Sequence, residues 1–241
     1  MQFDLNYTYS KSIDLASDAT RVGTTNGNNA QIVNAWIPYQ LRAVSDFDAT
    51  HQINGNWVVE LPFGKGRAFT HDANRALNAV IGGWQTTGLV RWTTGFPFTV
   101  LNGFNWATNW NLSGNANEIG PVKTGVYHSP TDPSVVNVFA NGSAAQTSFS
   151  EPFPGQAGQR NNLRGPGFFG LDMGLTKSWT MPWSEGQALQ FRWEVFNVLN
   201  AVRFDPLSIQ PTVDLSGSTF GQFSRLSTNP RVMQFALRYS F

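Results

Sequence analysis

Large apolar residues alternate with polar or small residues in several stretches of the chain. The C-terminal end shows the pattern most fully, with large residues at every odd position from Met233 to Phe241 and Gln, Ala, Arg and Ser between them. A period of two is typical of β-strands with one apolar and one solvated face. The pattern predicts six strands, at residues 3–9, 53–61, 84–100, 169–176, 189–195 and 233–241. Leu89 departs from it, because it falls on the polar side of the third strand.

The connections between these strands alternate in length. Long connections cover residues 13–48, 101–165 and 200–230, whereas a medium one covers 62–83 and a tight turn covers 181–186. Structureless loops beyond about 15 residues are uncommon in compact soluble domains. Outer-membrane barrels, in contrast, combine short periplasmic turns with long extracellular loops. We expect the longest connection, rich in Asn, Gly, Ser and Trp, to be a solvated surface element.

Strand length and aromatic placement favour a membrane barrel over a soluble sandwich. The segments 167–181, 187–200 and 231–241 reach the roughly 9 to 11 residues that a tilted membrane strand needs. Aromatic residues gather where the shorter turns leave the strands, as in an interfacial girdle. They are Phe63, Trp84, Trp179, Trp183, Tyr239 and Phe241. The alternative is a soluble sandwich with these aromatics in its core.

Composition excludes several classes of protein. With 16 Lys and Arg against 15 Asp and Glu, the net charge of +1 gives no basic surface for nucleic acid. The chain has no Cys, and no apolar run reaches the roughly 18 residues of a membrane helix. Residues 72–81 form the longest weakly helical stretch. The first residues lack the basic and apolar regions of a signal peptide.

Several segments resemble one family of outer-membrane proteins. The ending Arg238-Tyr-Ser-Phe241 looks like the C-terminal strand signature of bacterial outer-membrane proteins. Further segments resemble, in order, the C-terminal barrel portion of TonB-dependent receptors of the Oar-like, carboxypeptidase-regulatory-like group. They are Glu60-Leu-Pro-Phe-Gly-Lys-Gly66, Gly83-Trp-Gln85, Thr94-Gly-Phe-Pro-Phe98, Asn161-Asn-Leu-Arg-Gly-Pro-Gly-Phe168 and Phe196-Asn-Val-Leu-Asn200.

This resemblance implies a 22-stranded barrel of the bacterial outer membrane, filled by a plug domain. Such a barrel imports a scarce nutrient, a small molecule or an oligosaccharide, with energy delivered by TonB. We expect residues 1–241 to be an all-β, antiparallel C-terminal part of that barrel, an open curved sheet of about six strands without the plug and the earlier strands. Its partners are then outer-membrane lipid and, in the full-length protein, the plug and TonB.

Charged and amide residues on the polar sides of the strands are candidates for lining the lumen. They are Arg91, Asp172, Gln190, Arg192, Glu194, Gln234 and Arg238. We expect cross-strand pairing among them more than direct contact with substrate. Three loop aromatics, Trp36, Trp106 and Trp110, either stack on a ligand or pack within the loops.

The sequence offers no motif for catalysis or cofactor binding. His51, His71 and His128 lack metal-site spacing, and Asp46 and Asp48 are expected at the solvated start of a strand without an ion. Nucleophile motifs such as Gly-x-Ser-x-Gly are missing. We therefore predict a carrier and not an enzyme, with no metal or cofactor. Two alternatives stay open: a secreted carbohydrate-binding module that uses the loop tryptophans, and a small complete outer-membrane barrel.

Overall fold

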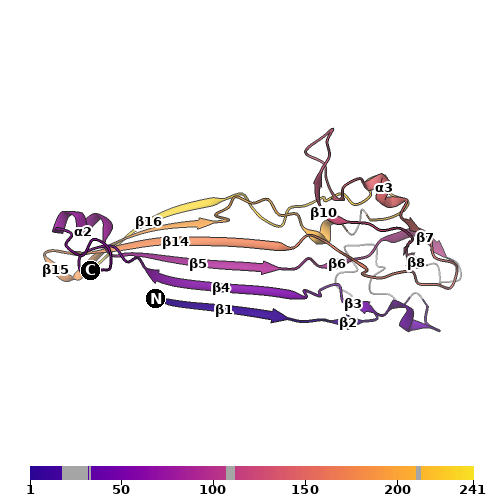
Figure 1. The fold of residues 1–241 in the computed structure, drawn as a ribbon, viewed down its shortest axis with the longest axis horizontal. Helices are drawn as coiled ribbons and strands as arrows, with labels where there is room; N and C mark the ends of the chain where they lie inside the picture. Colours follow the sequence, from indigo (N-terminus) through magenta and orange to yellow (C-terminus); the bar gives the residue numbers. More distant parts are fainter. Residues whose placement is uncertain (18–31, 33, 107–111, 210–212) are drawn as a thin grey trace.

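The computed structural model describes residues 1–17, 32, 34–106, 112–209 and 213–241. Six antiparallel strands form one sheet in the spatial order β1-β4-β5-β14-β15-β16, and the long connections gather beyond one end of it (Figure 1). The strands are β1 (Gln2–Tyr9), β4 (His51–Glu60), β5 (Trp84–Thr93), β14 (Phe168–Met181), β15 (Ser184–Phe196) and β16 (Val232–Ser240). All six strands predicted from the alternation are confirmed.

The third predicted strand ends earlier than expected. β5 stops at Thr93, and a separate short strand, β6 (Pro97–Phe98), pairs with β13 (Leu163–Arg164) instead. Two residues explain the break. Pro97 has no N–H to give to a strand ladder, and the backbone at Gly95 approaches Gly165 so closely that a Cβ would lie 1.8 Å from the Gly165 carbonyl oxygen. The prediction of one strand to residue 100 was therefore wrong.

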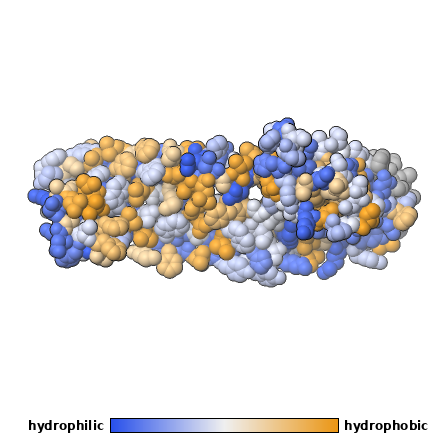
Figure 2. Space-filling view, turned by 45° about the horizontal axis from the view of Figure 1, so that its top comes forward, coloured by the Kyte–Doolittle hydropathy of each residue, from blue (hydrophilic) through white to orange (hydrophobic). Residues whose placement is uncertain are grey.

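Cross-strand register gives the sheet one apolar and one polar face. Leu175, Trp193 and Phe235 lie side by side on the apolar face, where the last two rings stack with centroids 6.0 Å apart. The next row belongs to the polar face and contains Gly174, Glu194 and Gln234. Among the described residues, no protein layer covers the apolar face of β16, where Phe235 is 67% exposed. Apolar colour is denser over the strands than over the loops in Figure 2.

The apolar face has the height of a membrane's hydrocarbon layer. Along β14 it runs from Phe169 to Trp179, ten residue steps of about 3.3 Å each, or roughly 33 Å. At the usual tilt of about 40° this corresponds to about 25 Å along the membrane normal, which equals the apolar band of outer-membrane barrels. Aromatic residues occupy both ends of the band, with Trp92 beside Phe169 and Tyr239 in the same row as Trp179.

The sheet is open. β1 pairs only with β4 and β16 only with β15, and no ladder joins β1 to β16 among the described residues. The expectation of an open sheet is confirmed in this arrangement of strands.

The described parts of the long connections form a lobe with a hydrophobic core of its own. Its core contains Phe98, Val138, Phe139, Phe149 and Ile209, all buried. The lobe's strands are β2 (Ile13–Asp14), β3 (Ala43–Val44), β6, β7 (Leu101–Trp106), β8 (Leu112–Asn115), β9 (Asn117–Glu118), β10 (Thr124–His128), β11 (Val136–Phe139), β12 (Phe149–Ser150) and β13. Its helical turns are η2 (Pro38–Leu41), α3 (Gly142–Gln146) and η4 (Pro206–Ile209). The apolar residues of this core come from connections that are far apart in the sequence. The alternating pattern therefore did not predict that they share a core.

The opposite end of the sheet carries the short connections. The predicted helical stretch is confirmed as α2 (Arg75–Ile81), whose N-cap Asn74 accepts a hydrogen bond from the Leu77 N–H. It lies near the C-terminus, far from the lobe (Figure 1). Within the described ranges, no helix is both long and apolar enough to cross a membrane.

Candidate functional site: the polar face and the base of the lobe

The seven candidate lumen residues occupy one face of the sheet. Register pairs Gln190 with Arg238 and Glu194 with Gln234, and Asp172 and Arg91 lie on neighbouring strands of the same face, with Leu89 opposite Asp172. Arg192 forms an ion pair with Glu194, to which Gln234 also donates a hydrogen bond. Asp172 accepts a hydrogen bond of 2.7 Å from the Asn197 backbone N–H. Among the seven, Glu194 thus has a cation on its own strand and an amide on the next strand as partners, and whether the polar face also contacts solute stays a prediction.

Two shallow cavities open on this face around Asp172. The larger, of about 450 Å³, is bordered by Leu89, Arg91, Asp172 and Phe196, together with residues 228–230 of the last long connection. The second, of about 320 Å³, shares Leu89, Asp172 and Phe196. Gly174 lies in the second cavity, where a side chain would meet the Thr87 hydroxyl. The polar face thus contains a recess that is bordered by the apolar residues Leu89 and Phe196 and by Asp172.

Sequence reasoning found only part of this recess. Leu89 stood out because it breaks the apolar alternation of β5, and the register confirms that it lies on the polar face opposite Asn56 and Asp172. Phe196 was not among the predicted residues of the polar face. It lies two positions after Glu194, at the end of β15, and a single apolar residue there does not stand out in the sequence. Both residues border both cavities.

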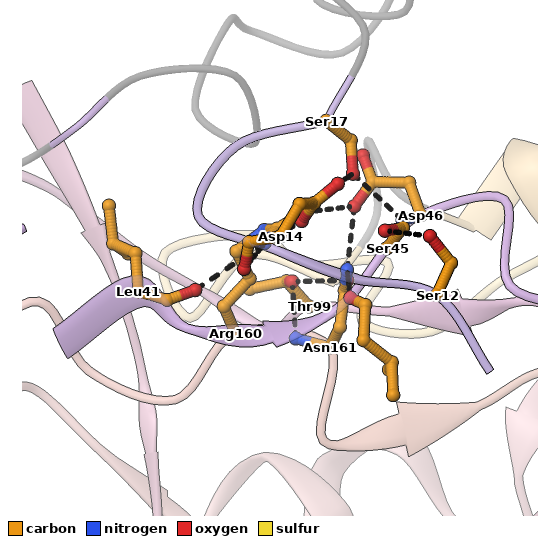
Figure 3. A network of polar contacts seen from close by, with 10 residues as sticks. Ser12, Asp14, Ser17, Leu41, Ser45, Asp46, Thr99, Arg160 and Asn161 are labelled. Atoms are coloured by element: carbon orange, nitrogen blue, oxygen red, sulfur yellow. Dashed lines mark hydrogen bonds and ion pairs between the residues drawn. The ribbon is translucent and has the colours of Figure 1, made fainter. Parts of the chain in front are cut away.

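A buried ionic network connects distant segments within the lobe (Figure 3). The Arg160 guanidinium is 1% exposed and forms ion pairs with Asp14 at 2.6 Å and Asp46 at 3.1 Å. Asn161 donates a hydrogen bond of 2.6 Å to the same Asp46 carboxylate. Asn161 has a φ of 52°, a left-handed conformation that Asn tolerates better than most residues. The network therefore fixes three segments of the chain, around residues 14, 46 and 160, to one another.

A second buried pair lies at the start of β4. The Asp48 carboxylate accepts a hydrogen bond of 2.5 Å from the Arg164 guanidinium and one of 2.7 Å from the Ser12 backbone N–H. Burial alone raises the pKa of the Asp48 carboxyl, but the hydrogen bonds from Arg164, Ser12 and Thr50 and the charge of Arg164 outweigh it, so the net pKa is lowered. The expectation that Asp46 and Asp48 are solvated was wrong, because arginines more than 110 positions away along the chain bury them.

Two of the three loop tryptophans lie within the described residues. Trp36 is exposed just before η2. Trp106 is the last residue of β7, and Trp110 lies outside the described residues. Ligand stacking by these three residues stays a prediction.

The geometry defines the wall of a transmembrane β-barrel, with an apolar surface for lipid, a polar surface for a lumen and elaborated loops at one end. Comparison with protein families agrees: the outer membrane beta barrel domain matches residues 1–234. The chain belongs to this family, and its location is the bacterial outer membrane. No curated protein and no solved structure shows significant similarity to the chain.

Proposed function

We propose that this chain forms part of the barrel of a TonB-dependent transporter that imports a nutrient. The ordered segments from Glu60 to Asn200 that resemble such receptors support the proposal. Its partners are then a plug domain, TonB and a small-molecule or oligosaccharide substrate. The chain acts as a carrier and not as an enzyme.

The single observation that carries this proposal is the polar face with its recess around Asp172. The interior face of an outer-membrane barrel is polar, and a row of charged and amide groups opposite the lipid fits a solute pathway through such an interior. Leu89 and Phe196 add apolar lining on which part of a solute or a plug can pack. The lobe, which lies at the end of the long loops, is then extracellular.

The open sheet edges fit a larger barrel. In the part of the chain that the structure describes, the outer edges of β1 and β16 have no ladder partner, and hydrocarbon cannot satisfy their backbone N–H and C=O groups. In the membrane these edges then pair with further strands. Six strands alone also enclose too little space, because about eight are needed for an interior that side chains can fill.

A transport assay with two neighbouring variants tests the proposal. Leu89→Trp fills the recess on the polar face, whereas Val90→Trp places the same bulk on the apolar face. Cells that make the protein are grown on a panel of single nutrients, with and without TonB. We expect the gene deletion and the TonB deletion to impair growth on the same nutrient, and Leu89→Trp to reduce uptake more than Val90→Trp. Uptake that is independent of TonB would indicate a passive pore instead.

A further inference from the structure

Lys177 is a charged residue on the apolar face of the sheet. It lies in β14 between Leu175 and Trp179, in the same row as Trp84 of β5 and Phe191 of β15. A lysine that faces lipid there is costly. In this structure Lys177 is 2% exposed, so protein covers it on the side where the neighbouring strands face lipid.

The cover is the C-terminal end of α2. The Lys177 Nζ donates to the carbonyl oxygens of Val80 at 2.9 Å and Gly82 at 2.5 Å. The Trp84 Nε1 donates to the same Val80 oxygen at 2.9 Å, and the Trp179 Nε1 donates to the Ala79 oxygen at 2.8 Å. The ammonium also lies 5.3 Å and 5.2 Å from the two indole centroids, within range of a cation–π contact.

These donors satisfy carbonyls that a helix leaves without partners at its C-terminal end. A positive charge at that position also complements the helix dipole. An isolated helix of seven residues is too short to be stable in water. The three donors all belong to the apolar face, so α2 is held against the outside of the sheet and not beneath its polar side.

The exposed side of this connection is apolar and partly basic. Leu77 and Val80 are three positions apart in α2 and exposed, Val80 at 67%. Phe63 and Phe69 of the same connection are also exposed, with ring centroids 5.5 Å apart. Lys65 and Arg75 are exposed cations among them. Apolar and basic residues together on a short helix and the segment before it are typical of an element that lies in a membrane interface.

We propose that α2 is an interfacial anchor that rests in the phospholipid layer on the short-turn side of the outer membrane. The clamp of Lys177, Trp84 and Trp179 holds the helix at the level of the aromatic girdle, so its apolar side continues the lipid-facing surface of β5 and β14. Val80 and Leu77 enter the outer part of the acyl region, and Lys65 and Arg75 contact lipid phosphates. The proposal rests on the outer-membrane location and not on transport.

Fluorescence quenching by lipids tests this contact. Because the chain has no Cys, Val80→Cys provides a single site for a thiol-reactive, environment-sensitive dye. The protein is purified from its cells and reconstituted into vesicles of phosphatidylethanolamine and phosphatidylglycerol that contain lipids with a nitroxide near the headgroup. We expect at least about a twofold loss of emission at position 80. Phe153→Cys, on the exposed surface of the lobe, is the negative control, and Leu237→Cys on the apolar face is the positive control.

The clamp is tested in the same assay. Lys177→Met removes both hydrogen bonds of the ammonium and leaves an apolar side chain on the lipid-facing surface. The substitution therefore adds no polar group to that surface. We expect quenching at position 80 to fall by about half or more, with quenching at position 237 unchanged. Quenching at position 80 by aqueous iodide alone, as at position 153, would overturn the lipid contact. Unchanged quenching in Lys177→Met would overturn the clamp.

Discussion

Removal of Arg160 is predicted to destabilise the lobe. The guanidinium is 1% exposed and contacts Asp14 and Asp46, whose side chains are themselves 25% and 9% exposed. In Arg160→Met both carboxylates stay in place without their cation. Removing one partner of a buried ion pair costs about 3 to 5 kcal/mol, because the remaining charge is uncompensated. Since Asp14 is partly open to solvent, we expect a loss of about 3 kcal/mol for local unfolding of the lobe.

Hydrogen exchange measures this loss directly. The Asp46 backbone N–H is buried and donates to the Ser17 hydroxyl at 2.9 Å, so it reports on opening of the network. A loss of about 3 kcal/mol raises the opening equilibrium, and with it the exchange rate, about a hundredfold. Mass spectrometry of peptides that contain residue 46 follows this rate in the protein reconstituted into vesicles.

A surface ion pair in the same lobe supplies the control. Arg225 lies 3.2 Å from Asp205 and is 66% exposed, so Arg225→Met should cost about 0 to 1 kcal/mol and change exchange less than about tenfold. Adding Asp46→Asn to Arg160→Met should recover part of the loss, because it removes one uncompensated charge. Equal, small effects of Arg160→Met and Arg225→Met would refute the role of the buried network.

Three further predictions concern the two faces, the lobe and the sheet edges. Phe235→Arg should cost about 2 to 4 kcal/mol of free energy for folding into vesicles, and Gln234→Arg much less because position 234 faces Glu194. Denaturant titration compares the two variants, and equal costs would contradict the assigned faces. Hydrogen bonds and arginine charge hold the pKa values of Asp14 and Asp48 below the ordinary range despite the opposing effect of burial. Their stabilisation is therefore fully present above the unfolded-state pKa and is lost as the pH falls below about 4, so lobe exchange should accelerate there and not between pH 5 and 7. The 241-residue chain alone should lack the heat-modifiable gel migration of a closed barrel; a compact, heat-sensitive band would show that β1 and β16 close on each other.

The strands were predictable from sequence because their pattern is local. Alternation alone located β1, β14, β15 and β16 and assigned the faces of Gln234 and Phe235. It could not predict where β5 ends, since that depends on a close backbone contact between Gly95 and Gly165. Local pattern also gives no information about partners that are distant along the chain.

The candidate site, like the fold, could be predicted from the sequence only in part. The charged positions of the polar face follow from a period of two, but the recess combines Leu89 of β5 with Phe196 of β15, which lie on either side of β14. Asp14 and Arg160 are 146 positions apart, and Lys177 reaches Gly82 across 95 positions. In the sequence Asp14, Arg160 and Lys177 are isolated charges. Only the folded chain shows that Arg160 pairs with Asp14 and that backbone carbonyl oxygens surround the Lys177 ammonium.

The central claim is that the six-stranded sheet separates lipid from an aqueous interior, and β16 offers the most direct measurement. Single cysteines at positions 232 to 239, each carrying a spin label, can be introduced one at a time because the chain has no Cys of its own. In the reconstituted protein, collisions with oxygen report lipid and collisions with a water-soluble nickel chelate report water. We predict that accessibility alternates with a period of two, with positions 233, 235, 237 and 239 open to oxygen and the positions between them open to nickel. Uniform accessibility, or alternation with the opposite phase, would contradict the account.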